Sequence, residues 1–111
     1  MSEKEGVYVT FITTPKGKGK EIARKLLENR LAACVNIFNV NSLYWWQGKI
    51  EDDEEELLVI KTSERVLKDL VDFVKRNHPY TVPEIIYWKV SGGNPDYINW
   101  VLAEATGQKQ A

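Results

Sequence analysis

The apolar residues of the chain recur with two different spacings, which predict alternating strands and helices. The segment Gly6 to Thr14 is rich in β-branched and aromatic residues and stops at Pro15, which indicates a buried strand. From Glu21 to Leu31 the apolar spacing becomes helical. The positions that this spacing places on one buried face are Ile22, Ala23, Leu26, Leu27 and Leu31.

Two long strand-like segments follow, Ala32 to Trp46 and Lys49 to Thr62, and Gln47-Gly48 between them is typical of a turn. Each has about fourteen residues, whereas an ordinary strand has about 5–6. At about 3.3 Å per residue each would span roughly 45 Å, more than a small domain needs to cover its core. We therefore expect this hairpin to project, bend or bulge, and to pair with another chain in a closed symmetric oligomer.

A second helix is predicted after Ser63, which is suited to be its N-cap. Its apolar stripe consists of Val66, Leu67, Leu70, Val71, Phe73 and Val74. The helix must end at His78, because Pro79 disfavours the helical conformation of the residue before it.

The last third of the chain predicts one more strand and a short helix. The strand covers Pro83 to Val90, and Gly92-Gly93 turns the chain after it. Asn94 is suited to cap the helix, with Pro95 at its first position. The side chains that we expect this helix to bury are Tyr97, Ile98, Trp100 and Val101.

The order of elements is β-α-β-β-α-β with a short C-terminal helix, an α+β arrangement of the ferredoxin-like type with an extended central hairpin. Right-handed crossovers would place both main helices on one face of a four-stranded antiparallel sheet. The 111 residues are expected to form a single domain with its core at about residues 7–104. Met1 to Glu5 and Gly107 to Ala111 are expected to be frayed tails.

Charge and composition exclude several classes of partner. Fifteen basic and sixteen acidic side chains give a net charge of −1, which does not favour binding to nucleic acid or to a membrane surface. No apolar run reaches about 18 residues, so no transmembrane helix is expected. The single cysteine forbids an internal disulfide and, with the polar N-terminal segment, favours a cytoplasmic location.

The aromatic run Tyr44-Trp45-Trp46 lies beside the predicted hairpin turn. It could be a stacking platform for an aromatic ligand, or it could fill a subunit interface. We favour the interface, because Lys49 is the one basic residue beside the run and a nucleic-acid platform would need more.

Three further motifs have a functional and a structural interpretation, and we favour the structural one for each. The acidic run Glu51 to Glu56 matches no calcium loop and is expected to be a solvated, bulged edge segment. The loop Pro15 to Lys20 precedes a helix but lacks the spacing of a phosphate loop, which favours a flexible basic loop. Cys34 has no companion typical of a zinc site or a catalytic triad and is expected to be a core residue.

His78 is the only histidine of the chain, and its place at a helix end suits a metal ligand, a proton carrier or a plain helix stop. Any metal site must therefore recruit other ligand types or other subunits. In an oligomer the segment after His78 is expected to lie close to a neighbour's hairpin. Tyr80, Glu84 and Lys61 are then candidate residues of a cleft between subunits, where Lys61 would pair with Glu84 or hold an anion.

Several segments in a fixed order resemble the CutA family of divalent-cation tolerance proteins. The matching segments are Arg30-Leu31-Ala32-Ala33-Cys34-Val35-Asn36, Tyr44-Trp45-Trp46-Gln47-Gly48-Lys49-Ile50, Ile60-Lys61-Thr62, His78-Pro79-Tyr80-Thr81-Val82-Pro83-Glu84 and Tyr97-Ile98-Asn99-Trp100-Val101. The resemblance implies a ferredoxin-like subunit, a very stable homotrimer similar in assembly to the PII signalling trimers, and a cytoplasmic role in metal tolerance. It also implies copper and other divalent ions as ligands, and no enzymatic activity.

The resemblance also implies positions for copper ligands, and this chain departs from two of the three. The family's first-strand cysteine position holds Ile12, one of its histidine positions holds Asn77, and only His78 remains. Our leading hypothesis is a trimeric metal-tolerance protein that is not an enzyme and requires no cofactor. The alternatives are a PII-like regulator that binds a small anion between subunits and a ferredoxin-like hydrolase. The hydrolase would need an arginine in the loop after the first strand, where this chain has lysines.

Overall fold

The computed structural model describes residues 6–107, and they form four strands and three helices with a 3-10 turn. The elements are β1 (Val7–Pro15), α1 (Gly19–Glu28), β2 (Cys34–Trp46), β3 (Lys49–Ser63), η1 (Glu64–Val66), α2 (Leu67–Asn77), β4 (Ile85–Lys89) and α3 (Pro95–Glu104). The predicted order and the α+β ferredoxin-like class are confirmed. The predicted frayed tails lie outside the described residues except for Gly107, whose N–H donates a hydrogen bond of 2.8 Å to the carbonyl of Arg30.

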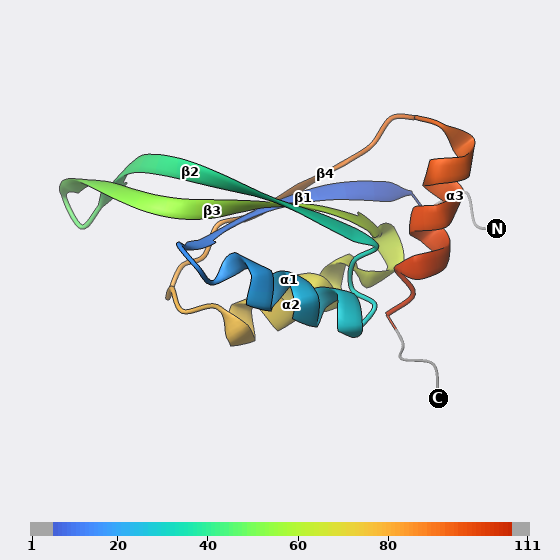
Figure 1. The fold of residues 1–111 in the computed structure, drawn as a ribbon, viewed down its shortest axis with the longest axis horizontal. Coiled ribbons are helices and arrows are strands. Elements are labelled where there is room, and N and C mark those ends of the chain that lie inside the picture. The colour runs from blue at the N-terminus through green and yellow to red at the C-terminus, as the bar shows by residue number, and fades with distance from the viewer. Residues whose placement is uncertain (1–5, 108–111) are drawn as a thin grey trace.

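The four strands form one antiparallel sheet in the order β2-β3-β1-β4. Both main helices, α1 and α2, cover the same face of this sheet, as the right-handed crossovers predict, and α3 packs at one end of it (Figure 1). None of the helices in residues 6–107 has the length and apolarity needed to cross a membrane.

The core lies between the sheet and the helices α1 and α2. Its fully buried side chains include Ile12 of β1, Leu58 and Ile60 of β3, Leu26 of α1 and Leu70 of α2. A second, smaller apolar cluster joins α3 to the sheet through Val7, Val101 and Leu102. The larger cluster thus packs against the sheet face that α1 and α2 cover, and the smaller one lies at the end of the sheet where α3 packs.

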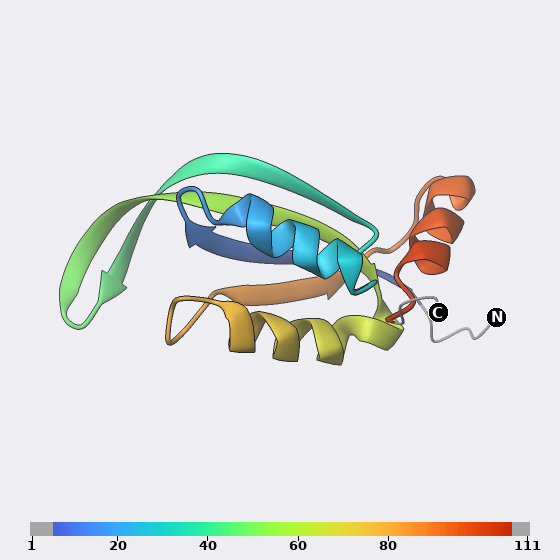
Figure 2. The same cartoon turned by 60° about the horizontal axis from the view of Figure 1, so that its bottom comes forward.

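The β2-β3 hairpin extends well beyond the rest of the sheet. Glu55 is the last residue of β3 that pairs with β1, so the remainder of the hairpin is a two-stranded ribbon. Figure 2 shows this ribbon curving toward the side of the sheet on which β4 lies. Gln47 and Gly48 have φ of 49° and 80°, the left-handed conformations that a tight hairpin turn requires. The hairpin therefore projects and bends as predicted, but its register is continuous and the predicted bulge is absent.

Two predictions about helix α1, its last residue and the burial of Leu27, are wrong. Helix α1 ends at Glu28 rather than Leu31, because Arg30 adopts a φ of 57° and Leu31 donates its N–H to the carbonyl of Leu26. This Schellman arrangement returns Leu31 to the core outside the helix. Leu27, predicted to be buried, is 40% exposed.

Two further predictions, the N-cap at Ser63 and the buried face of α3, are also wrong, whereas the cap at Asn94 is confirmed. The hydroxyl of Ser63 does not cap the following turn and instead donates to the carbonyl of Ala105 at 2.7 Å. Asn94 does cap α3, accepting a hydrogen bond of 3.1 Å from the N–H of Asp96. Because α3 contacts the sheet only at one end, it buries a narrow face with Val101 and Leu102, and the predicted core residues Tyr97 and Trp100 are exposed.

Candidate functional site

The curved hairpin and the segment between α2 and β4 enclose a cleft of about 910 Å³. It brings together most of the residues that the sequence singled out: Tyr44, Trp45, Trp46, Tyr80 and Glu84. Within one chain the segment after His78 faces the chain's own hairpin, and its expected approach to a neighbour's hairpin in an oligomer stays a prediction. The ribbon's curvature, which the sequence pattern does not reveal, is the cause (Figure 2).

His78 holds the segment after α2 in place. It is buried at the C-cap of α2, and its Nδ1 accepts a hydrogen bond of 3.0 Å from the N–H of Tyr80. Nε2 therefore carries the proton and donates to the carbonyl of Thr13 at 2.7 Å. Both ring nitrogens are thus engaged within the chain, and a metal ion could bind either only by displacing one of these hydrogen bonds.

Glu55 and Tyr80 form the polar floor of the cleft. Glu55 is 5% exposed and accepts a hydrogen bond of 2.7 Å from the Tyr80 hydroxyl. Burial, followed by the nearby carboxylate of Glu55, raises the pKa of Tyr80. Burial within the cleft, followed by the charge of Glu55, also raises the pKa of the Glu84 carboxyl. The charge of Glu55 thus disfavours the ionised form of Glu84.

The hairpin wall of the cleft is fixed by a second tyrosine–carboxylate pair. The Tyr44 hydroxyl donates to Asp53 at 2.5 Å, and this hydrogen bond is the main reason that the pKa of Tyr44 rises to about 12. Both tyrosines therefore stay protonated at neutral pH and act as hydrogen-bond donors toward carboxylates.

Lys61 does not take part in this cleft. It lies opposite Val9 on β1 and donates hydrogen bonds to Asn36 and to the sulfur of Cys34, whereas Glu84 comes just before β4, at the other end of β1. The pairing of Lys61 with Glu84 is not made within one chain, and a pairing between subunits stays a prediction. Cys34 is half-buried beside Lys61 on the sheet face opposite α1 and α2, so its predicted place in the core is wrong.

The acidic run is neither bulged nor simply solvated, contrary to the prediction. Its carboxylates have separate partners: Glu54 pairs with Lys16 at 2.9 Å, Glu55 accepts from Tyr80, and Glu56 accepts from the N–H of Gly19 at 2.8 Å. Within residues 6–107, no group of three or more histidine, cysteine, aspartate or glutamate side chains is placed to hold a metal ion. The run therefore does not form a cation cage.

Glu56 also explains why the lysine-rich loop is not a phosphate site. Its carboxylate already occupies the N-terminus of α1, where a phosphate would bind. A side chain at Gly19 would place its Cβ 2.6 Å from this carboxylate oxygen, so a larger residue there would displace the carboxylate from the helix N-terminus. The structure agrees with the interpretation of this segment as a basic connecting loop.

The copper site that the sequence resemblance implies does not fit the residues present. Ile12 is fully buried in the apolar core, and the amide of Asn77 donates to the carbonyl of Phe73 at 2.8 Å. His78 has both nitrogens hydrogen-bonded. Three positions therefore supply one imidazole that is already occupied, which is too few ligands for a dedicated copper site.

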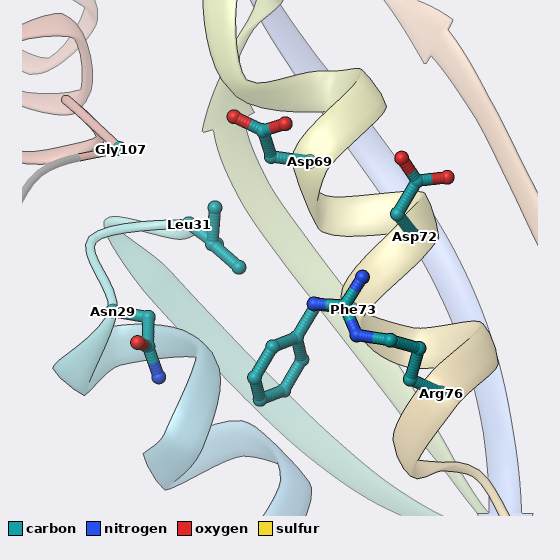
Figure 3. Close-up of a pocket in the computed structure, with 7 residues that line it drawn as sticks. All are labelled: Asn29, Leu31, Asp69, Asp72, Phe73, Arg76 and Gly107. Carbon is teal, nitrogen blue, oxygen red and sulfur yellow. The ribbon is translucent and has the colours of Figure 1, made fainter.

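A second, smaller hollow of about 260 Å³ lies between the end of α1 and helix α2 (Figure 3). Two of its charged side chains, Asp72 and Arg76, already have partners. Asp72 pairs with Lys68 at 2.9 Å, and the Arg76 guanidinium lies 6.0 Å from the centre of the Phe73 ring. We therefore regard the hairpin cleft, rather than this hollow, as the candidate site.

The face of the sheet opposite α1 and α2 is an uncovered apolar surface that we call the open face. Strand register and side-chain alternation place the following apolar residues on it: Val9, Phe11, Phe38, Leu57, Val59, Ile86 and Trp88. Phe38, Ile86 and Trp88 are 53%, 53% and 44% exposed. Sequence reasoning missed this surface, although the nearly continuous apolar runs in β1 and β4 were a signal that both faces of these strands carry apolar side chains.

Comparison with known proteins decides the family. The family described as CutA1 divalent ion tolerance protein matches residues 7–104. The chain belongs to this family. The predicted resemblance to CutA proteins is confirmed over nearly the whole described structure.

Individual relatives agree in sequence and in fold. The CutA 1 protein of Oryza sativa, described as chloroplastic, is 47% identical over 95 residues, and the CutA protein of Mus musculus is 48% identical over 97 residues. These matches cover 84% and 86% of this chain but only 54% and 55% of the two relatives, so the chain spans about half their length. The divalent-cation tolerance protein of Thermus thermophilus is 46% identical over 101 residues, which are 89% of this chain and 97% of that protein.

Solved structures of the family superpose closely on this chain. The CutA1 structure of Thermus thermophilus has a TM-score of 0.85 at 42% identity and covers 88% of this chain and 97% of its own. The CutA1 structure of Ehrlichia chaffeensis has a TM-score of 0.86 at 30% identity and covers 93% and 98%. The ferredoxin-like arrangement with its long hairpin is therefore the CutA1 fold.

Proposed function

We propose that this CutA1-family chain acts as a cytoplasmic homotrimer in divalent metal-ion tolerance, without catalytic activity of its own. The main support for the homotrimer is the exposed apolar surface of the open face. A single chain would expose Phe38, Ile86 and Trp88 together with the aromatic hairpin tip, and a soluble monomer rarely exposes an apolar surface of that extent. A closed symmetric assembly would cover it and leave no open edge.

The role in metal tolerance is proposed because the chain belongs to the CutA1 family, which is described by divalent-ion tolerance. The proposal does not include a specific copper site. For any divalent ion, His78 is the one imidazole that a subunit can supply, and it lies at one of the ligand positions that the family resemblance implies. Binding through His78 would need its hydrogen bond to Thr13 or Tyr80 to open, so we expect it to be weak. The cytoplasmic location is supported by the single, unpaired cysteine Cys34.

The PII-like alternative, an anion bound between subunits, receives less support from the site. The cleft contains Glu55 and Glu84 and would repel an anion, and Lys61 is engaged with Asn36 elsewhere on the sheet. An anion site would therefore have to be built on the open face around Lys61.

Truncation of an aromatic residue at the hairpin tip tests the homotrimer. We expect Trp46→Ala to weaken assembly by about 2 kcal/mol for each interface, because a large aromatic anchor is removed from a buried position. Sedimentation equilibrium should find a trimer for the wild type and a concentration-dependent mixture for the variant. Asn39→Ala, an exposed residue of the same strand, is the control and should remain trimeric. A wild-type monomer at micromolar concentration would disprove the homotrimer.

Replacement of His78 tests the metal-binding part of the proposal. We expect His78→Gln to remove copper binding measured by isothermal titration calorimetry, because it removes the imidazole. Asn77→Gln, one position earlier, should leave the binding unchanged, and circular dichroism should show that both variants fold. An unchanged copper affinity in His78→Gln would place the metal site elsewhere.

A further inference from the structure

We propose that the outer face of helix α3, formed by Asp96, Tyr97 and Trp100, is the docking surface for the hairpin tip of a second copy of this chain. The tip residues that meet it are Trp46 and Lys49. The proposal rests on the homotrimer proposed above and names the two different surfaces that join in each of its interfaces. The outer face of α3 then serves assembly rather than the fold of a single subunit.

A closed trimer joins unlike surfaces of its subunits. Three identical subunits in a ring form head-to-tail interfaces, so a surface of one subunit meets a different surface of the next. Figure 1 shows the hairpin tip and α3 at opposite ends of the molecule. The tip carries Trp46 and α3 carries Tyr97 and Trp100, so each end presents exposed aromatic side chains, as a head-to-tail contact needs.

The outer face of α3 is aromatic although it contributes little to the core of a single chain. Helix α3 buries Val101 and Leu102 against the sheet, whereas Tyr97 and Trp100 are 40% and 42% exposed. These two side chains lie one turn apart, and their ring centres are 5.5 Å from each other. They therefore form one continuous aromatic surface of the kind that marks an interaction site.

This aromatic surface continues the open face. The row of strand residues at the α3 end of the open face consists of Trp88, Val9, Lys61 and Cys34. Tyr97 lies beside this row, since burial, followed by the neighbouring Cys34 thiol, raises its pKa. A neighbour that covers the open face up to this row therefore also reaches α3.

The charges of the two surfaces are complementary. Trp46 and Lys49 are paired in the hairpin register, so their side chains lie on the same side of the ribbon, and Glu51 follows on that side farther from the turn. Helix α3 contains no lysine or arginine, and its exposed Asp96 lies one turn before Trp100. When Trp46 packs on the aromatic surface of α3, Lys49 can pair with Asp96.

Carbodiimide cross-linking of mixed oligomers tests this contact directly. Equal amounts of isotope-labelled and unlabelled full chains are refolded together, and the reagent then joins lysine amines to carboxylates that they touch. Mass spectrometry should find Lys49 of one chain joined to Asp96 of a chain with the other label. A cross-link from Lys49 to Glu84 of the neighbour, with none to Asp96, would place the tip elsewhere and overturn the proposal.

Charge exchange between the two surfaces provides a second test. Lys49→Glu and Asp96→Lys should each weaken assembly at least about fivefold for each interface, because each brings like charges together. The variant with both substitutions should recover most of this loss, which a purely structural role of either residue would not allow. Sedimentation equilibrium over a dilution series measures the affinity, and circular dichroism checks the fold. Glu28→Lys, a charge reversal on the exposed surface of α1, is the control and should leave assembly unchanged.

Truncation of the aromatic residues completes the test. Trp100→Ala should weaken assembly at least about tenfold for each interface, whereas Tyr87→Ala, at a residue that is 49% exposed on the other face of β4, should not. Adding Trp46→Ala to Trp100→Ala should cost clearly less than the product of the two single effects, because both remove the same contact. A wild-type trimer with no loss in Trp100→Ala, or with no recovery in the charge-exchanged variant, would overturn this docking surface and leave the homotrimer standing. A wild-type monomer would overturn both.

Discussion

Ile86→Asp is expected to convert the oligomer into folded monomers. Ile86 is 53% exposed on the open face in a single chain, so the substitution should cost the subunit little. In an assembly that covers this face, the new carboxylate would be buried without a partner, at a cost of about 4–7 kcal/mol for each copy. Association would then weaken more than about a thousandfold. Sedimentation velocity at micromolar concentration should show monomers, and circular dichroism should show an unchanged fold.

The neighbouring residue provides a matched control for Ile86→Asp. Tyr87 is 49% exposed but points to the opposite face of β4, which is the side of the helices. Tyr87→Asp should therefore leave the oligomer intact, apart from the loss of an edge-to-face contact with Tyr8. An intact oligomer in Ile86→Asp, or dissociation in both variants, would show that the open face is not the interface.

Leu58→Ala is expected to lower the free energy of unfolding by about 3–5 kcal/mol. Leu58 is fully buried between the sheet and the helices α1 and α2, where a Cβ added at Gly19 would lie 2.9 Å from its Cδ1. The surrounding elements cannot collapse into the space without moving Gly19 and its hydrogen bond to Glu56. Urea unfolding, followed at a fixed protein concentration, measures the loss as a lower transition midpoint.

The control for Leu58→Ala is Leu27→Ala. The two substitutions delete the same atoms, but Leu27 is 40% exposed on α1, so its loss should cost less than about 1 kcal/mol. Equal destabilisation by the two substitutions would contradict the assignment of the core to the helix-covered face.

The elements of the fold were predictable because local rules govern them. The change from strand spacing to helix spacing placed β1 and α1, Pro79 ended α2 at Asn77, and Asn94 with Pro95 began α3. The errors lie where a residue's partner comes from far along the chain. Ser63 bonds to Ala105 instead of capping a helix, and Glu56 bonds to Gly19 instead of facing solvent.

The candidate site was predictable only as a set of residue types. The sequence singled out Tyr44, Trp46, Tyr80 and Glu84, and the structure brings them into one cleft. Glu55 was missed as an individual residue, because nothing local distinguishes it from the five other carboxylates in its run. Its burial and its hydrogen bond to Tyr80 exist only because the segment after His78 folds back across the end of β1.

The sequence by itself therefore determined the strands and helices, their order, the ferredoxin-like class and the family, since periodicity, prolines, caps and motifs are local properties. Only the tertiary structure decided which sheet face stays uncovered, how the hairpin curves and which carboxylates are buried. These depend on the twist of a fifteen-residue strand and on contacts between segments such as Glu55 and Tyr80. Side-chain alternation tells the two faces of a strand apart, but it does not reveal which face the helices will cover.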